Sequence, residues 1–171
     1  MVVLIPLEIA SRELLFKVYL SHMLTLNGFT CYLGRKKSIW FLAKKMKGYV
    51  YIDKGYHAEH SELIYDIVRS RSGFIVSLDE EGAVDFSSNE TLMKRYSKAL
   101  FKKIDHVFFW GRSQFDIVKD NIQNNLNYSI TGHPRFELLK PKYSKLYEVE
   151  AKSISERYGD FILINTNMGF G

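Results

Sequence analysis

The sequence predicts an α/β fold with a doubly wound, mostly parallel sheet. Short runs of apolar and β-branched residues recur along the chain, spaced by roughly 20 to 30 residues, the length of a strand plus a crossover helix. Most of these runs are continuously hydrophobic, as in parallel strands that are covered on both faces. The segments between them carry the 3.6-residue period of amphipathic helices. Strand and helix therefore alternate, which favours right-handed crossovers in one sheet.

Seven runs are predicted strands: residues 2–7, 29–33, 49–53, 74–78, 106–110, 128–131 and 161–164. The first six are expected to form one sheet in the order 3-2-1-4-5-6. The seventh comes after the linker-like Lys140, Pro141 and Lys142, and we expect it to be the first strand of another domain.

The first predicted helix follows the strand at 2–7 and ends at Asn27-Gly28, a typical helix stop. Its apolar residues form a stripe that should pack on the sheet, with Arg12 and Lys17 off the stripe. The stripe consists of Leu14, Leu15, Val18, Tyr19, Met23 and Leu26. The same period predicts one helix in each later crossover, including a single helix around residues 92–104, and a last helix at 143–158.

Composition sets limits on the class of protein. A chain of 171 residues suits one well-buried domain and is short for two, and 46% hydrophobic with 15% aromatic residues excludes low-complexity disorder. The single cysteine, Cys31, permits no internal disulfide. The net charge of +5 suits an anionic ligand or membrane surface, and we expect no nucleic-acid partner.

The N-terminal residues lack the basic start of a signal peptide, and no segment approaches the ~18 apolar residues of a membrane span. We therefore expect a cytoplasmic protein. Basic residues gather on two predicted helices, which indicates either a solvated face or peripheral contact with the anionic inner face of the cytoplasmic membrane. They are Lys36, Lys37, Lys44, Lys45 and Lys47 on one helix, and Lys94, Arg95, Lys98, Lys102 and Lys103 on the other.

Ligands of open parallel sheets bind at the carboxyl ends of the strands, so the residues after each run form the candidate site. That edge is rich in ionisable residues and glycine. It comprises Glu8; Gly34, Arg35 and Lys36; Lys54, Gly55, Tyr56 and His57; Asp79, Glu80, Glu81 and Gly82; Gly111, Arg112 and Ser113; Gly132, His133, Pro134 and Arg135; and Asn165, Thr166 and Asn167.

The best catalytic candidates are Asp79, Glu80 and Glu81. Adjacent carboxylates repel one another, so a buried member should have a raised pKa, as a general base requires. The alternative is that one carboxylate caps the next helix and the others are solvated. No D-x-D or histidine cluster accompanies them, and no metal site is expected. The chain also lacks a G-x-G-x-x-G segment and a Walker A lysine, so we expect no bound cofactor.

Two further positions are candidates for substrate binding. His133 precedes Pro134, which keeps its backbone extended and should direct the ring into the cleft, and Arg135 is suited to pair with a phosphate or carboxylate. The alternative is a purely structural turn. Arg12 and Glu13 begin the first helix, where backbone N–H groups suit an anion. The carboxylates of Glu8 and Glu13 would oppose an anion there unless Arg12 pairs with them.

Six pieces of the chain together resemble one family. They are Ile5-Pro6-Leu7-Glu8 with Arg12-Glu13, Gly34-Arg35, Asp79-Glu80-Glu81-Gly82, Phe109-Trp110-Gly111, Thr131-Gly132-His133-Pro134-Arg135-Phe136 and Ile164-Asn165-Thr166-Asn167. Their combination resembles the bacterial surface carbohydrate biosynthesis proteins, found with capsule and O-antigen assembly genes. The Asp-Glu-Glu-Gly and Thr-Gly-His-Pro-Arg-Phe pieces are the most specific.

The resemblance implies a glycosyltransferase of the GT-B architecture, in which two Rossmann-like halves face each other across a cleft. Residues 1–140 would be the acceptor-side Rossmann-like domain, 141–158 a linker helix and 159–171 the start of a truncated second Rossmann-like domain. A fragment that ends at Gly171 is expected to be inactive alone, because the second half of a GT-B enzyme supplies most of the nucleotide-sugar site.

The implied activity is sugar transfer from a nucleotide-sugar donor, as co-substrate, to a glycan or lipid-linked acceptor of surface polysaccharide. Asp79, Glu80 or Glu81 would be the base. The substrate-binding residues would be Glu8, Arg12, Glu13, Gly82, Gly111, His133, Arg135, Asn165, Thr166 and Asn167. Two alternatives stay open: a sugar-nucleotide epimerase of the same architecture, and a non-catalytic module that binds partners or membranes.

Overall fold

The structure is a computed structural model that describes residues 1–81, 89–122 and 125–164. The chain forms two compact units, Met1–Phe136 and Glu137–Gly171, and each is described by itself. The first unit contains a six-stranded sheet, all of it parallel, with helices in every crossover. The predicted α/β class with a Rossmann-like parallel sheet is confirmed.

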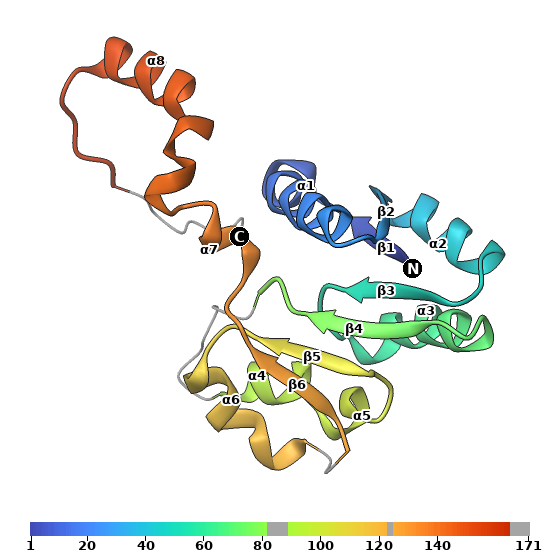
Figure 1. Cartoon of the computed structure of the whole chain (residues 1–171). Coiled ribbons are helices and arrows are strands. Elements are labelled where there is room, and N and C mark those ends of the chain that lie inside the picture. Colours follow the sequence, from blue (N-terminus) through green and yellow to red (C-terminus); the bar gives the residue numbers. More distant parts are fainter. Residues whose placement is uncertain (82–88, 123–124, 165–171) are drawn as a thin grey trace. The chain divides into compact units, whose positions relative to one another are not determined.

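The strands lie in the order β2-β1-β3-β4-β5-β6, which can be followed in Figure 1. Their bounds are β1 Val2–Leu7, β2 Thr30–Arg35, β3 Tyr49–Asp53, β4 Phe74–Leu78, β5 His106–Phe109 and β6 Asn127–Ile130. In this register Leu4 of β1 lies between Tyr32 of β2 and Tyr51 of β3.

The expected order 3-2-1-4-5-6 is wrong, because β3 pairs with β1 and leaves β2 at the edge. Burial explains the difference. Tyr49, Tyr51 and Asp53 of β3 are buried, whereas no residue of β2 is. The ring and hydroxyl of Tyr49 are both accommodated in the interior, where the hydroxyl donates to the carbonyl of Ala43 at 2.8 Å.

This correction moves the place where a ligand is expected. A doubly wound sheet opens a crevice where its strand order reverses. In the observed order the reversal lies between β1 and β3, so the crevice is flanked by the residues that follow Pro6 and Asp53.

The helices of the first unit follow from the crossovers. Their bounds are α1 Ala10–Leu26, α2 Lys36–Lys45, α3 Ala58–Ser70, α4 Glu90–Arg95, α5 Lys98–Phe101, α6 Arg112–Val118, the 3₁₀ turn η1 Lys119–Asn121 and α7 Pro134–Glu137, whose last residue belongs to the second unit. Right-handed crossovers in opposite directions place α1 on one face of the sheet and α2 on the other. Within the described residues, no helix is long and apolar enough to cross a membrane.

Helix α1 is turned differently from the prediction. Leu14, Leu15 and Val18 are exposed, whereas Glu13, Phe16 and Lys17 are buried. The predicted apolar stripe therefore does not pack on the sheet. Glu13 and Lys17 turn inward because their ionic partners, Lys54 and Glu80, lie at the carboxyl edge of the sheet.

The second unit contains the 3₁₀ turn η2, Pro141–Leu146, and helix α8, Glu148–Tyr158. Residues 161–164 are exposed and form no strand, so the strand predicted there is wrong. A strand requires a neighbour for its backbone hydrogen bonds. That these residues begin a further Rossmann-like domain stays a prediction.

Candidate functional site

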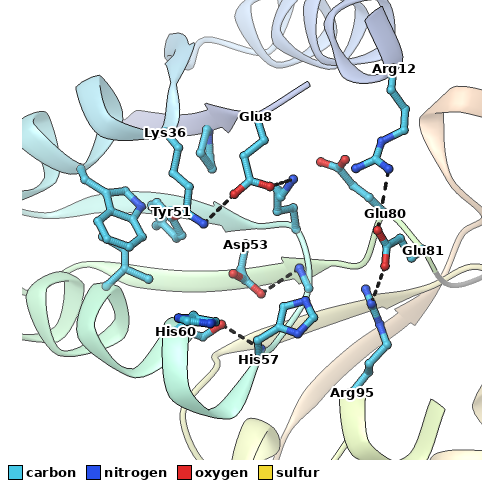
Figure 2. Close-up of a pocket in the computed structure, with 16 residues that line it drawn as sticks. Glu8, Arg12, Lys36, Tyr51, Asp53, His57, His60, Glu80, Glu81 and Arg95 are labelled. Carbon is cyan, nitrogen blue, oxygen red and sulfur yellow. Dashed lines mark hydrogen bonds and ion pairs between the residues drawn. The ribbon is translucent and has the colours of Figure 1, made fainter. Parts of the chain in front are cut away.

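A cavity of about 110 Å³ lies at the reversal point of the sheet. Its walls come from the carboxyl ends of β1, β3 and β4 and from helices α1 to α4, as Figure 2 shows. The lining residues are Pro6, Glu8, Arg12, Lys36, Trp40, Tyr51, Asp53, Lys54, Gly55, His57, His60, Ser61, Ile64, Glu80, Glu81 and Arg95.

Glu13 holds the loop between β1 and α1. Its carboxylate accepts the backbone N–H groups of Glu8 and Ile9, at 2.9 and 3.2 Å, and hydrogen bonds from Lys17 at 2.8 Å and Lys54 at 3.0 Å. Burial alone would raise its pKa, but these donors, with Lys17 first among them, lower it to about 2. Glu13 is fully buried. Glu13 therefore anchors the loop and is not open to contact with a substrate.

Lys17 connects three elements beneath the cavity. Its ammonium donates to the carbonyl of Pro6 at 2.6 Å and to Glu13 at 2.8 Å, and it lies 2.6 Å from Oε1 of Glu80. These three partners use the three N–H bonds of the ammonium. The helical pattern had placed Lys17 on the solvent side, so sequence reasoning missed it.

The three adjacent carboxylates have different surroundings. Asp79 is buried and receives two nitrogens of Arg95, with Nε at 2.7 Å from Oδ2. Glu81 is half-exposed and binds Nη1 of the same guanidinium at 2.7 Å. One arginine therefore pairs with both outer members of the run. Arg95 had been assigned to a basic helix face, and the structure places it in the site instead.

Glu80 points the other way, into the interior. It is only 5% exposed, and Oε2 lies 4.0 Å from Nη2 of Arg135. Burial raises its pKa; the ammonium of Lys17 opposes that rise and the charge of Glu13 adds to it. The buried carboxyl of this run with a raised pKa is Glu80, but the main cause is its burial and not repulsion from Asp79 and Glu81.

Glu8 and Arg12, both predicted site residues, line the cavity. Glu8 bridges Lys36 at 2.6 Å and Lys54 at 2.5 Å. Burial would raise the pKa of Glu8, but the hydrogen bonds from these lysines lower it. Arg12 lies 3.6 Å from Glu13 and 3.8 Å from Glu81, so it does pair with nearby carboxylates.

The cavity also contains residues that sequence reasoning missed because it placed β3 wrongly. Asp53, at the end of β3, is buried, and burial raises its pKa to about 7 although Gly55 N–H donates to it at 3.1 Å. His60 lines the same cavity, together with His57, which was expected at this edge of the sheet. The correct strand order would have pointed to Asp53 and His60.

Two details keep the cavity open. Trp40 donates its indole N–H to the hydroxyl of Tyr51 at 3.2 Å, which fixes an aromatic wall. Gly55 has a φ of +142°, and a Cβ there would lie 2.7 Å from Nη2 of Arg95. A side chain at this position would therefore be strained and would displace the arginine that holds Asp79.

The remaining predicted residues divide into three groups. His133 and Arg135 lie beside Glu80, but His133 is buried between the rings of Phe16 and Trp110 and does not project into an open cleft. Gly111 precedes α6 and does not line the cavity. Gly82, Asn165, Thr166 and Asn167 lie outside the described residues.

Within residues 1–81, 89–122 and 125–164, no group of three or more His, Cys, Asp or Glu side chains is arranged to hold a metal ion. Comparisons of the chain with protein-family models, with curated proteins and with solved structures found no match. The geometry described above is therefore the basis for a function.

Proposed function

We propose that this chain is the acceptor-side half of a glycosyltransferase that builds surface polysaccharide from a nucleotide-sugar donor. The observation that carries the proposal is the carboxyl of Glu80, buried at the crevice of a doubly wound sheet with a raised pKa. The resemblance of the Asp79–Gly82 and Thr131–Phe136 segments to surface carbohydrate biosynthesis proteins supports the choice of reaction.

Glu80 is suited to be the general base. In the proposed step an acceptor hydroxyl attacks the anomeric carbon of the donor sugar, the bond from that carbon to the nucleotide phosphate breaks, and the hydroxyl proton passes to Glu80. A carboxylate with a raised pKa is a better base than a free one near neutral pH. Asp79 and Glu81 are held by Arg95, which favours Glu80 as the base among the three.

The cavity supports an acceptor rich in hydroxyl groups. Its cations and carboxylates largely neutralise one another, as Glu8 does for Lys36 and Lys54. The aromatic wall of Trp40 and the buried carboxyl of Asp53 face the same space. A stacking surface beside polar hydrogen-bonding groups suits a sugar ring better than a fully charged ligand.

The test is sugar transfer by the protein expressed from its complete reading frame, with a nucleotide-sugar and an envelope glycan as substrates. Glu80→Gln should lower kcat/KM by about 10²-fold or more, the usual contribution of a general base. Glu81→Gln is the matched control, since Glu81 is half-exposed and paired, and should retain most of the activity. Undiminished transfer by Glu80→Gln would contradict the assignment.

The same assay distinguishes the transferase from the alternative, an epimerase. An epimerase acts on the nucleotide-sugar without an acceptor, so conversion of the sugar in the absence of glycan would replace the transferase proposal. Hydrolysis alone would support neither reaction.

Peripheral membrane contact is proposed for α2. Phe41 is 61% exposed, and the ammonium of Lys45 lies 5.7 Å from its ring. An exposed aromatic residue among lysines is typical of helices that rest on anionic lipid. Sedimentation with phosphatidylglycerol vesicles should be lost in Phe41→Ser combined with Lys45→Ser, and binding by that variant equal to the unaltered protein would contradict the proposal.

A further inference from the structure

Buried polar atoms without hydrogen-bond partners gather at one place in the described chain. Four of them belong to Glu80, His133 and Arg135. They are Oε2 of Glu80, Nε2 of His133, and Nε and Nη2 of Arg135, whereas Oε1 of Glu80 is paired with the ammonium of Lys17 at 2.6 Å. Folded proteins leave few buried groups unpaired, so a cluster of them requires an explanation.

The hydrogen bonds of His133 fix its chemistry. Its Nδ1 accepts the backbone N–H of Arg135 at 3.1 Å, so the neutral ring carries its proton on Nε2. Burial, followed by the positive charges of Arg135 and Lys17, lowers the pKa of His133 to about 4. At neutral pH the ring therefore presents one unpaired N–H donor at Nε2.

Arg135 presents two more donors. Nε and one terminal nitrogen form an edge of the guanidinium that matches two oxygens of a phosphate or carboxylate. The group stacks on Phe16, with Cζ 5.2 Å from the ring centroid. The Arg135 side chain as a whole is 31% exposed, although Nε and Nη2 themselves are buried.

Glu80 adds an acceptor to these donors. Its Oε2 is 4.0 Å from Nη2 of Arg135, too far for a hydrogen bond, whereas Oε1 lies beside Lys17 at 2.6 Å. A carboxylate next to a bound anion is repulsive unless the ligand brings an O–H group to it. Three N–H donors beside one carboxylate therefore match an oxyanion with a hydroxyl on the adjoining atoms.

We propose that His133, Arg135 and Glu80 form a subsite for a sugar phosphate, with the N–H groups on the phosphate oxygens and Glu80 accepting from a sugar hydroxyl. The oxyanion subsite is inferred from the unpaired donors alone. The choice of a sugar phosphate over free phosphate rests on the proposed function.

Binding can be measured without any transfer reaction. In a Trp40→Phe background, Trp110 is the remaining tryptophan and lies 4.6 Å from the His133 ring, so its fluorescence reports on the subsite. α-D-Glucose 1-phosphate should change this fluorescence with saturation, inorganic phosphate should bind more weakly, and glucose should not bind. In ¹⁵N spectra of the protein with native tryptophans, free His133 should show the Nε2–H tautomer, and its Nε2 resonance should shift on binding.

Substitutions test the donors of Arg135 and His133 one at a time. Arg135→Lys keeps the charge but loses the paired nitrogens and should weaken binding of glucose 1-phosphate about tenfold or more, whereas Arg157→Lys, an arginine that stacks on Tyr158 at 5.1 Å, is the matched control and should leave it unchanged. His133→Gln keeps a donor near the Nε2 position and should bind better than His133→Asn.

The outcomes distinguish this inference from the proposed function. An unmoved Nε2 resonance, or equal affinity in Arg135→Lys, would overturn the subsite even if sugar transfer occurs. Equal binding of inorganic phosphate and glucose 1-phosphate would keep the oxyanion subsite and overturn the hydroxyl contact. Binding without any transfer would leave the subsite in place and contradict the transferase.

Discussion

At the scale of single residues, the carboxyl edge of the sheet depends on a buried ammonium. Lys17 of α1 joins the end of β1, its own helix and the turn after β4 through Pro6, Glu13 and Glu80. Buried ion pairs are weak evidence for stability, because desolvation opposes the attraction, but removing one partner leaves an uncompensated charge. The contribution of Lys17 to stability is therefore best measured by replacing its side chain.

Lys17→Met should lower the free energy of unfolding at pH 7 by ~3–5 kcal/mol, because Glu80 would remain buried without the ammonium beside it and Glu13 would keep only Lys54 and Arg12. Urea unfolding measures this. Lys37→Met, at an exposed position of α2, is the control and should change stability by less than ~0.5 kcal/mol. Equal stability of the two variants would show that Lys17 does not hold the edge together.

Asp53 should make stability depend on pH. Its folded pKa of about 7 lies above the value of 3.8 for a free aspartate, so the folded state holds a proton that the unfolded state has released. Stability is then full below about pH 4 and falls as pH rises towards 7, by up to ~4 kcal/mol from this group. Asp53→Asn stays neutral and should remove this part of the pH dependence.

The measurement is the difference in unfolding free energy between the unaltered protein and Asp53→Asn at pH 5 and at pH 8. The variant should gain relative to the unaltered protein at pH 8. This difference cancels the contributions of Glu80 and Glu13 to the pH dependence, because both groups titrate in both proteins. A difference that does not change with pH would show that Asp53 is ionised in the folded state throughout.

At the scale of elements, α1 determines how the site is built. An apolar stripe would ordinarily turn towards the sheet, yet this helix buries Glu13 and Lys17 and leaves Leu14, Leu15 and Val18 exposed. The only large apolar side chain of α1 that is fully buried in the described structure is Phe16. The helix is thus fixed by its ionic contacts and one aromatic ring.

This orientation predicts opposite effects for adjacent positions. Phe16→Ala should lower the free energy of unfolding by ~3–5 kcal/mol, the usual loss for a buried ring. Leu15→Gln removes a side chain that is 48% exposed and should cost less than ~0.5 kcal/mol. Denaturant unfolding of the two variants decides between the structure and the predicted stripe, which would make Leu15 the costly position.

Local pattern predicted the types of the elements but not their arrangement. All six strands of the sheet and their crossover helices were predicted, because strand runs and helical periods are local properties. The long helix expected around 92–104 is instead α4 and α5, because the hydroxyl of Ser97 accepts from Leu100 N–H and starts a new helix. Strand order was missed because it depends on which strand the rest of the fold buries.

The residues of the candidate site were likewise predictable only in part. Asp79, Glu80 and Glu81 were predictable since they follow a strand in a run of like charges, but the sequence could not show that Arg95 pairs with Asp79 and Glu81 and leaves Glu80 apart. Asp53 and Lys17 were missed for a related reason. Each acquires its role from a neighbour on another element, and neither has a distinctive local pattern.

At the scale of the whole molecule, the question is whether the first unit folds alone. Met1–Phe136 contains every strand of the sheet and the cavity. Its hydrophobic core is drawn from β1 and β3–β5 and from helices α2–α6. A single core of this kind is the usual condition for an independent, cooperative fold.

A fragment of residues 1–140 should therefore unfold in one cooperative transition, with a urea midpoint close to that of the whole chain. The fragment keeps His133 and Arg135, so it should also keep the Nε2–H tautomer of His133 in ¹⁵N spectra. A fragment of residues 1–110, which lacks β6, α6 and the His133 segment, is the matched control and should lose cooperativity, because Phe109 of β5 would lose Phe115 and Tyr128 from its surroundings. If residues 1–140 behaved like that control, the second unit would be part of the fold of the first, and the subsite at Arg135 would have to be studied in the whole chain alone.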